Sequence, residues 1–205
     1  MTSLLPVFMF AVASVITPGP NNVIVFNSVL HKGVRKTLPV YLGICVGFPI
    51  LFIISGVGLG EAFHVYPILH EVLKILGITY LLMLAYKIAT QEDDVNIKST
   101  IIPSSFTGGM LFQWINPKAW VIAIGGISTY TPSGAGIVEI LSIAGVFLFA
   151  TLACMGFWLL VGHSAKSSVS SVRGMLVMNK VMGTVLALSV VPAIWEILAQ
   201  LQYQA

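Results

Sequence analysis

Long apolar runs separated by short polar segments make up almost the whole chain. A membrane-spanning helix needs about 20 apolar residues to cross a hydrocarbon layer roughly 30 Å thick. The pattern predicts six such helices, at about residues 4–30, 38–60, 67–89, 106–130, 140–162 and 181–201. The third is the least apolar because it carries Glu71, Lys74 and Lys87, and an interfacial or re-entrant segment is the alternative there. The predicted fold class is all-α integral membrane.

The basic residues indicate how these helices are oriented. Eight of the ten lysines and arginines follow the first, third or fifth predicted helix: Lys32, Arg35, Lys36, Lys87, Lys98, Lys166, Arg173 and Lys180. The connections at 61–69 and 131–139 and the last residues, 202–205, contain none. Because cytoplasmic loops are enriched in basic residues, we expect the basic connections in the cytoplasm and both termini outside.

Two proline-containing interruptions divide the chain into similar halves. Pro18 lies near the middle of the first predicted helix, and Pro117 lies near the middle of the fourth, 99 residues later. The first helix enters the membrane from outside and the fourth from the cytoplasm, so the halves have opposite topology. This pattern predicts two inverted three-helix repeats with helices 1 and 4 broken near the bilayer midplane. The repeats are 1–89 and 106–205, and the polar stretch 90–105 is their cytoplasmic linker.

The first interruption indicates a binding site through its sequence, Thr17-Pro18-Gly19-Pro20-Asn21-Asn22. Proline has no N–H, so the carbonyls of Ser14 and Ile16 lose their helical partners and must line a cavity or find another donor. Such carbonyls suit an ammonium group, and the free N–H groups at the start of the next half-helix suit a carboxylate. A small zwitterionic amino acid offers both groups. A plain proline kink between packed helices is the alternative.

The second interruption, Asn116-Pro117-Lys118, adds a charge. A lysine in the middle of a span is expensive, and such residues usually face a cavity and mark function. We interpret Lys118 as the counter-charge for the substrate carboxylate; a structural lysine bonded to the freed carbonyls is the alternative. The predicted substrate-binding residues are Thr17, Pro18, Gly19, Pro20, Asn21, Asn22, Asn116, Pro117 and Lys118.

Composition excludes several other classes of protein. Only 8% of the residues are charged and 57% are hydrophobic, whereas a soluble domain carries about 25% charged residues. The net charge of +3 comes from basic connections without interleaved aromatic residues, so it does not indicate binding to nucleic acid. Cys45 and Cys154 lie in apolar runs without metal-ligand spacing, so no metal, cofactor or disulfide is expected.

A passive channel or a structural membrane protein competes with a transporter, and an intramembrane enzyme is a further alternative. A hydrolase needs a nucleophile with a base, or paired aspartates. No Asp lies in a predicted span, and His163 is the only histidine flanking the last three spans, so no catalytic residue is assigned. A channel usually builds its pore by oligomerisation, which a single chain does not reveal. Two inverted broken helices favour a transporter that exposes one site alternately to the two sides.

Glycines recur along the second predicted helix. Gly43 and Gly47, and then Gly56 and Gly60, are each four residues apart, a spacing that allows close helix contact. The contact could serve packing within one chain or in a homodimer.

The motif Thr17–Asn22, followed in the second half by Asn116-Pro117-Lys118-Ala119, resembles the LysE/RhtB family of amino-acid exporters. The resemblance covers the whole chain and includes 31–35, the Gly43–Gly47 pair, and Asn179-Lys180. It implies a proton-driven antiporter that exports neutral or basic amino acids and related metabolites. It also implies a bacterial inner membrane, contact with lipid, and protons as the coupling partner. Both termini are then periplasmic.

One departure from the family pattern changes the expected chemistry. Many members carry Asp directly after the second glycine of the pair in the second helix, where this chain has Phe48. No carboxylate is therefore expected at this place for proton coupling or for binding an amine. An apolar residue here, together with an intact first motif, resembles the cysteine and O-acetylserine exporters.

Overall fold

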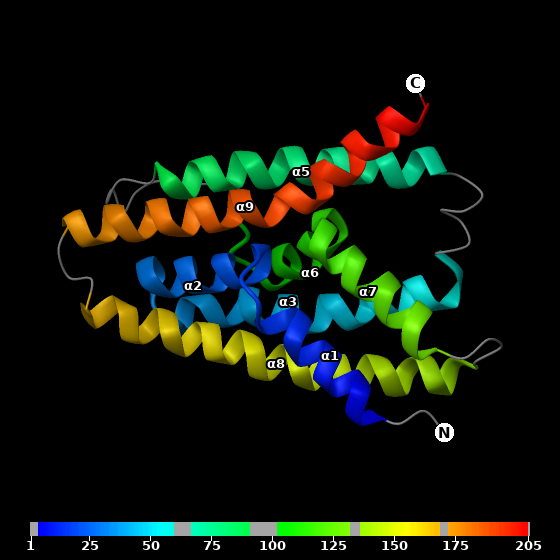
Figure 1. The fold of residues 1–205 in the computed structure, drawn as a ribbon. Coiled ribbons are helices and arrows are strands. Elements are labelled where there is room, and N and C mark those ends of the chain that lie inside the picture. The colour runs from blue at the N-terminus through cyan, green and yellow to red at the C-terminus, as the bar shows by residue number, and fades with distance from the viewer. Residues whose placement is uncertain (1–3, 60–66, 91–101, 132–135, 169–171, 205) are drawn as a thin grey trace.

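The computed structural model describes residues 4–59, 67–90, 102–131, 136–168 and 172–204, and within these ranges the chain is helical without a strand (Figure 1). Its elements are α1 (Leu4–Ile16), α2 (Pro20–Lys32), α3 (Val34–Ile54), the π-helical turn η1 (Ser55–Leu59), α5 (Pro67–Ala89), α6 (Phe106–Ile115), α7 (Pro117–Tyr130), α8 (Ile137–Ser168) and α9 (Val172–Gln204). The predicted all-α class is confirmed.

Three helical stretches are each long and apolar enough to cross a membrane: Val34–Gly58, Ile137–Ala165 and Arg173–Ala199. The pair α1 and α2 adds a fourth if it is counted as one bent span. Among the described residues the predicted third and fourth spans do not meet the same criterion. The apolar part of α5 is only Ile75–Ala89, and the fourth span is divided into α6 and α7, of 10 and 14 residues. A multi-pass membrane protein is therefore supported, and six spans in inverted repeats stay a prediction.

The two ends of the helix bundle follow the predicted alternation. In Figure 1 the C-terminal ends of α2, α5 and α8 lie at one end of the bundle, and both chain termini lie at the other. Basic side chains at the first end, among them Lys32, Lys36, Lys87 and Lys180, are exposed. The bundle thus separates a basic end from the end that carries both termini. That the basic end faces the cytoplasm remains a prediction from the sequence.

Glycine allows α3 and α6 to approach each other closely. A Cβ added to Gly43 would meet the Phe106 carbonyl, and one added to Gly47 would lie 2.7 Å from the Cα atom and the carbonyl oxygen of Met110. Gly109, on α6, is equally close to α3, because a Cβ added there would meet the Val40 carbonyl. The glycines of this pair therefore serve packing within one chain, and a homodimer stays a prediction.

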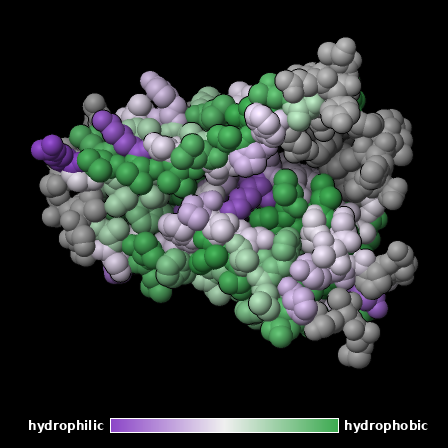
Figure 2. All heavy atoms as spheres, in the orientation of Figure 1, coloured by the Kyte–Doolittle hydropathy of each residue, from purple (hydrophilic) through white to green (hydrophobic). Residues whose placement is uncertain are grey.

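Buried side chains form two apolar clusters. One cluster centres on α2, α3, α5, α8 and α9, and the other on α1, α3, α7 and α8. Large apolar side chains also lie outside, among them Leu111, Val121, Phe149, Leu188 and Trp195. Figure 2 shows that much of the surface on the drawn face is hydrophobic. Such a face is a liability in water, but lipid tails cover it in a membrane.

Candidate functional site

The first predicted interruption is a break between two half-helices. α1 ends at Ile16 and α2 begins at Pro20, with a bend of 55° between them. Pro18 and Pro20 lack the N–H that a continuous helix needs, and Pro20 suits the first position of α2, where the N–H would have no partner. Gly19 is extended, with a φ of −176°, and it has no side chain to cap α2. The first N–H groups of α2 therefore have no side-chain cap at the break.

Side chains of the protein itself satisfy the carbonyls that the prolines free in α1. Thr17 Oγ1 donates to the Ser14 carbonyl at 2.9 Å, and Asn22 Nδ2 donates to the Val15 carbonyl at 2.9 Å. Trp158 Nε1 donates to the Ile16 carbonyl at 3.0 Å. The Ser14 and Ile16 carbonyls thus find donors within the protein, which is one of the two outcomes that the sequence allowed, and binding of a substrate ammonium there stays a prediction. An unpaired carbonyl in hydrocarbon is costly, and these bonds remove that cost.

The second predicted interruption is also a break. α6 ends at Ile115 and α7 begins at Pro117, while Asn116 between them is non-helical, with φ −90° and ψ 103°. Asn116 Oδ1 accepts a hydrogen bond of 3.1 Å from the N–H of Lys118 and so caps α7. The two half-helix starts thus differ, because α7 is capped by a side chain and α2 is not.

Lys118 joins the two breaks. Its ammonium donates to the Thr17 carbonyl and to Thr17 Oγ1, both at 2.8 Å, and to the Pro18 carbonyl at 3.3 Å. Gly19 provides the space for this contact, since a Cβ there would lie 2.8 Å from Lys118 Cδ and 2.9 Å from Lys118 Nζ. The contact expected of a structural lysine is therefore present. A role in binding substrate depends on what lies beside it.

Three side-chain amides connect α2 to the second break. Asn21 Nδ2 donates to Gln113 Oε1 at 2.9 Å, and Gln113 Nε2 donates back to Asn21 Oδ1 at 3.1 Å. Asn116 Nδ2 donates to the same Asn21 oxygen at 3.3 Å. Gln113 is fully buried and also donates to the Gly109 carbonyl at 3.0 Å. The network holds the two breaks in register, since α2 and α6 belong to different halves of the chain.

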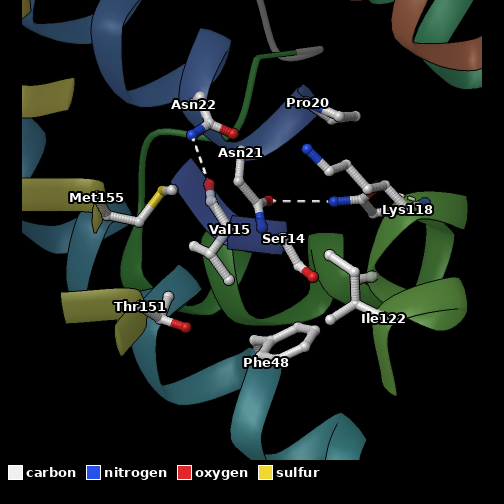
Figure 3. A pocket seen from close by; sticks show the side chains of 12 residues that line it. Ser14, Val15, Pro20, Asn21, Asn22, Phe48, Lys118, Ile122, Thr151 and Met155 are labelled. Carbon is white, nitrogen blue, oxygen red and sulfur yellow. Dashed lines mark hydrogen bonds between the residues drawn. The ribbon is translucent and has the colours of Figure 1, made fainter. Parts of the chain in front are cut away.

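A pocket lies beside these contacts, between the two apolar clusters (Figure 3). The pocket is open at its mouth, and the 320 Å³ or so of space not filled by protein atoms there includes open solvent. Figure 3 shows Thr151 and Met155 of α8 on one side, and Lys118 and Ile122 of α7 on the other. Its lining residues are Ser14, Val15, Pro20, Asn21, Asn22, Phe48, Asn116, Lys118, Ala119, Ile122, Thr151 and Met155.

The chemistry of the lining is one cation, several neutral polar groups and an apolar wall. Lys118 is the only charged residue in the described lining, and the polar groups beside it are amides and hydroxyls. Figure 2 shows hydrophilic atoms in the middle of the hydrophobic face, over the region where α1, α6 and α7 meet in Figure 1. Polar groups at this depth in a membrane protein usually line a substrate or ion pathway. The positive charge of Lys118 can attract a carboxylate, and the described lining has no negative charge that would attract a cation.

The two breaks and the pocket lie inside the part of the chain that matches a known family. The family model described as LysE type translocator matches residues 12–192. The chain belongs to the LysE type translocator family. The resemblance inferred from the sequence is thereby confirmed, and this translocator is a transporter rather than an enzyme. The family and the apolar helices together make it a multi-pass protein of the inner membrane.

Two similar proteins carry the same name. A cysteine/O-acetylserine efflux protein of Klebsiella pneumoniae is 29% identical to the translocator over 157 residues, which cover 75% of this chain and 79% of the relative. A protein of the same name from Escherichia coli K12 is 28% identical over 169 residues, 79% of this chain and 83% of the relative. No solved structure matches the translocator.

Five of the nine predicted site residues line the pocket: Pro20, Asn21, Asn22, Asn116 and Lys118. Thr17, Pro18 and Gly19 lie against Lys118 but outside the lining, and Pro117 begins α7 without lining the pocket. That these residues bind substrate stays a prediction.

The structure adds other residues to those predicted. Gln113 is the centre of the amide network, and its signal in the sequence is a polar residue within an apolar run, three residues before Asn116. Phe48, Thr151 and Met155 join the pocket from other helices. The sequence marks Phe48 by its place directly after the Gly43–Gly47 pair, whereas no local motif marks Thr151 or Met155. Among the described residues, no group of three or more His, Cys, Asp or Glu side chains is placed to hold a metal ion.

Proposed function

We propose that this translocator exports a small neutral amino acid, of the cysteine or O-acetylserine kind, from the cytoplasm. The observation that carries the proposal is that the Lys118 ammonium bridges both helix breaks at the edge of a pocket. The family assignment and the names of the relatives support amino-acid efflux. Among the described residues, the pocket lining contains no Asp or Glu to balance a second positive charge, which disfavours cationic amino acids.

The contacts of Lys118 suggest how binding leads to transport. Its ammonium has three protons and is bonded to three oxygen atoms of the first break, on Thr17 and Pro18. A substrate carboxylate entering the pocket competes for these protons as a charged acceptor, and charged acceptors form stronger bonds than neutral carbonyls. Binding therefore loosens the link between α7 and the first break. The uncapped N-terminus of α2 provides a second attraction for the carboxylate.

The proposed architecture is that of two inverted three-helix repeats, 1–89 and 106–205, joined by the linker 90–105. Its support is that each half begins with a broken helix, and that the two breaks touch through Lys118. Loosening this contact lets one repeat rock against the other, so that the site opens to alternate sides. The proton gradient drives the cycle in this proposal, with exchange of substrate for protons. A homodimer is compatible with it but is not needed for the site.

We expect reporter fusions to place the basic end of the bundle in the cytoplasm. The reason is that connections rich in lysine and arginine stay on the cytoplasmic side when a membrane protein inserts. Fusions after Lys36 and Arg173 should give a cytoplasmic signal, and fusions after Glu61 and Pro132 should give a periplasmic signal. A periplasmic signal after Arg173 would contradict the inverted-repeat proposal.

Transport into inside-out membrane vesicles tests the proposed function. Vesicles that contain the translocator should accumulate radiolabelled cysteine or O-acetylserine above the level of empty-vector vesicles, and an uncoupler should abolish the accumulation. Labelled lysine serves as the cationic control and should not accumulate. Equilibration that the uncoupler leaves unchanged would favour a passive channel, and no movement of any amino acid would refute the proposal.

A further inference from the structure

Thr151, in the middle of α8, is buried without a hydrogen-bond partner in the wall of the pocket. Its side chain is 1% exposed, and Oγ1 has no partner. It lies among the apolar pocket residues Phe48 and Met155, on the opposite side from Lys118 (Figure 3). A buried hydroxyl without a partner is unfavourable, and each such group in a folded protein calls for an explanation.

Other hydroxyl side chains of this chain donate a hydrogen bond to their own helix, which Thr151 does not. Thr37, Ser55, Thr79, Thr90 and Ser142 each donate to the carbonyl four residues earlier, at 2.7 to 2.9 Å. This bond is the ordinary way for a helical hydroxyl to be satisfied in an apolar setting. The hydroxyl of Thr151 has no such bond, so neither its donor nor its acceptor is used by another described group.

Other buried polar atoms do not lie where a substrate would reach them. Asn27 Nδ2, Ser28 Oγ and Thr131 Oγ1 also lack a partner, but none of these residues lines the pocket. Thr151 is therefore the pocket residue whose polar group is both buried and unsatisfied among the described residues.

We propose that the hydroxyl of Thr151 recognises the heteroatom of the substrate's side chain, and that it thereby selects small amino acids carrying a thiol, hydroxyl or ester over their hydrocarbon analogues. This inference rests on the proposed function, because it places the substrate carboxylate at Lys118. The side chain then extends toward α8, where Phe48 and Met155 bury its carbon atoms and Thr151 meets its one polar atom. A site built to hydrogen-bond a substrate group discriminates against analogues that lack that group.

The test compares two substrates that differ in one group of the side chain. Cysteine and 2-aminobutyrate have the same shape, but a methyl group replaces the thiol in the second. Thr151→Val and Thr151→Ala both remove the hydroxyl, and Thr151→Ser keeps it. Thr79→Val is the matched control, since Thr79 is exposed on α5 and its hydroxyl bonds to the Ile75 carbonyl. All variants are assayed in inside-out vesicles at matched amounts of inserted protein.

We expect Thr151→Val and Thr151→Ala to reduce the apparent affinity for cysteine by about three- to tenfold, the size of one neutral hydrogen bond, without reducing it for 2-aminobutyrate. Thr151→Ser and Thr79→Val should keep the wild-type preference. An equal loss for both substrates would overturn the inference, since the hydroxyl would then bind the amino or carboxyl group that they share. No change in preference would also overturn it. Failure of the wild type to transport any amino acid would instead refute the proposed function.

Discussion

Replacing Lys118 with methionine is expected to reduce transport by about ten- to a hundredfold, which corresponds to losing one charge-assisted contact of about 1.5–3 kcal/mol. Methionine has similar length and keeps the apolar part of the side chain, but it donates no proton. The loss should appear as weaker apparent affinity for substrate in vesicle transport. The amount of inserted protein, measured by immunoblot of membranes, should change much less than transport does.

Lys36→Met is the matched control for this variant. Lys36 is an exposed lysine near the start of α3, at the basic end of the bundle and away from the pocket. Its replacement removes the same charge and should leave transport near the wild-type level. Full transport by Lys118→Met would mean that the lysine serves only to join the two breaks.

Replacing Asn21 with leucine is expected to weaken transport strongly and also to lower the stability of the translocator. Leucine leaves Gln113 Oε1 without its donor and Asn116 Nδ2 without its acceptor. An unsatisfied buried polar group costs about 1–3 kcal/mol, so transport should fall about fivefold or more. Thermal denaturation in detergent should show a lower midpoint than for the wild type.

A double-mutant cycle shows whether this loss belongs to the amide network. Gln113→Leu should have an effect similar to that of Asn21→Leu, because both remove the same pair of hydrogen bonds. The combined loss should be smaller than the sum of the two single losses, since Asn21 and Gln113 are then removed together and only Asn116 Nδ2 is left without its acceptor. Losses that simply add would mean that Asn21 and Gln113 act separately.

The breaks in the helices were predictable from the sequence because proline acts locally. Pro18, Pro20 and Pro117 lack an N–H and each lies beside Gly or Asn, which helix interiors disfavour, whereas α3 continues through Pro39 and Pro49. The sequence also placed a lysine at one break and unsatisfied carbonyls at the other. The prediction was one substrate site formed by Lys118 and the first break, and the alternative was a structural lysine bonded to carbonyls freed at either break. The structure has the direct contact, to Thr17 and Pro18.

The rest of the site depends on tertiary packing, which no local pattern encodes. The Ile16 carbonyl is satisfied by Trp158, 142 residues later in the chain. In the sequence Thr151 is one more small residue in an apolar helix. Only the packing of α8 places it in the pocket wall. Similarly, only the structure shows that Gly43 allows close packing of α3 against α6 within this chain.

Competition by an analogue without a carboxylate tests most directly whether Lys118 binds the substrate carboxylate. Cysteamine is cysteine without its carboxyl group, and both are used as competitors of labelled cysteine in inside-out vesicles. The wild type should prefer cysteine over cysteamine by about ten- to a hundredfold, the size of one charge-assisted contact. Lys118→Met should bind the two competitors about equally. A variant that transports poorly but keeps the full wild-type preference for cysteine would contradict the account, because the carboxylate would then be bound elsewhere.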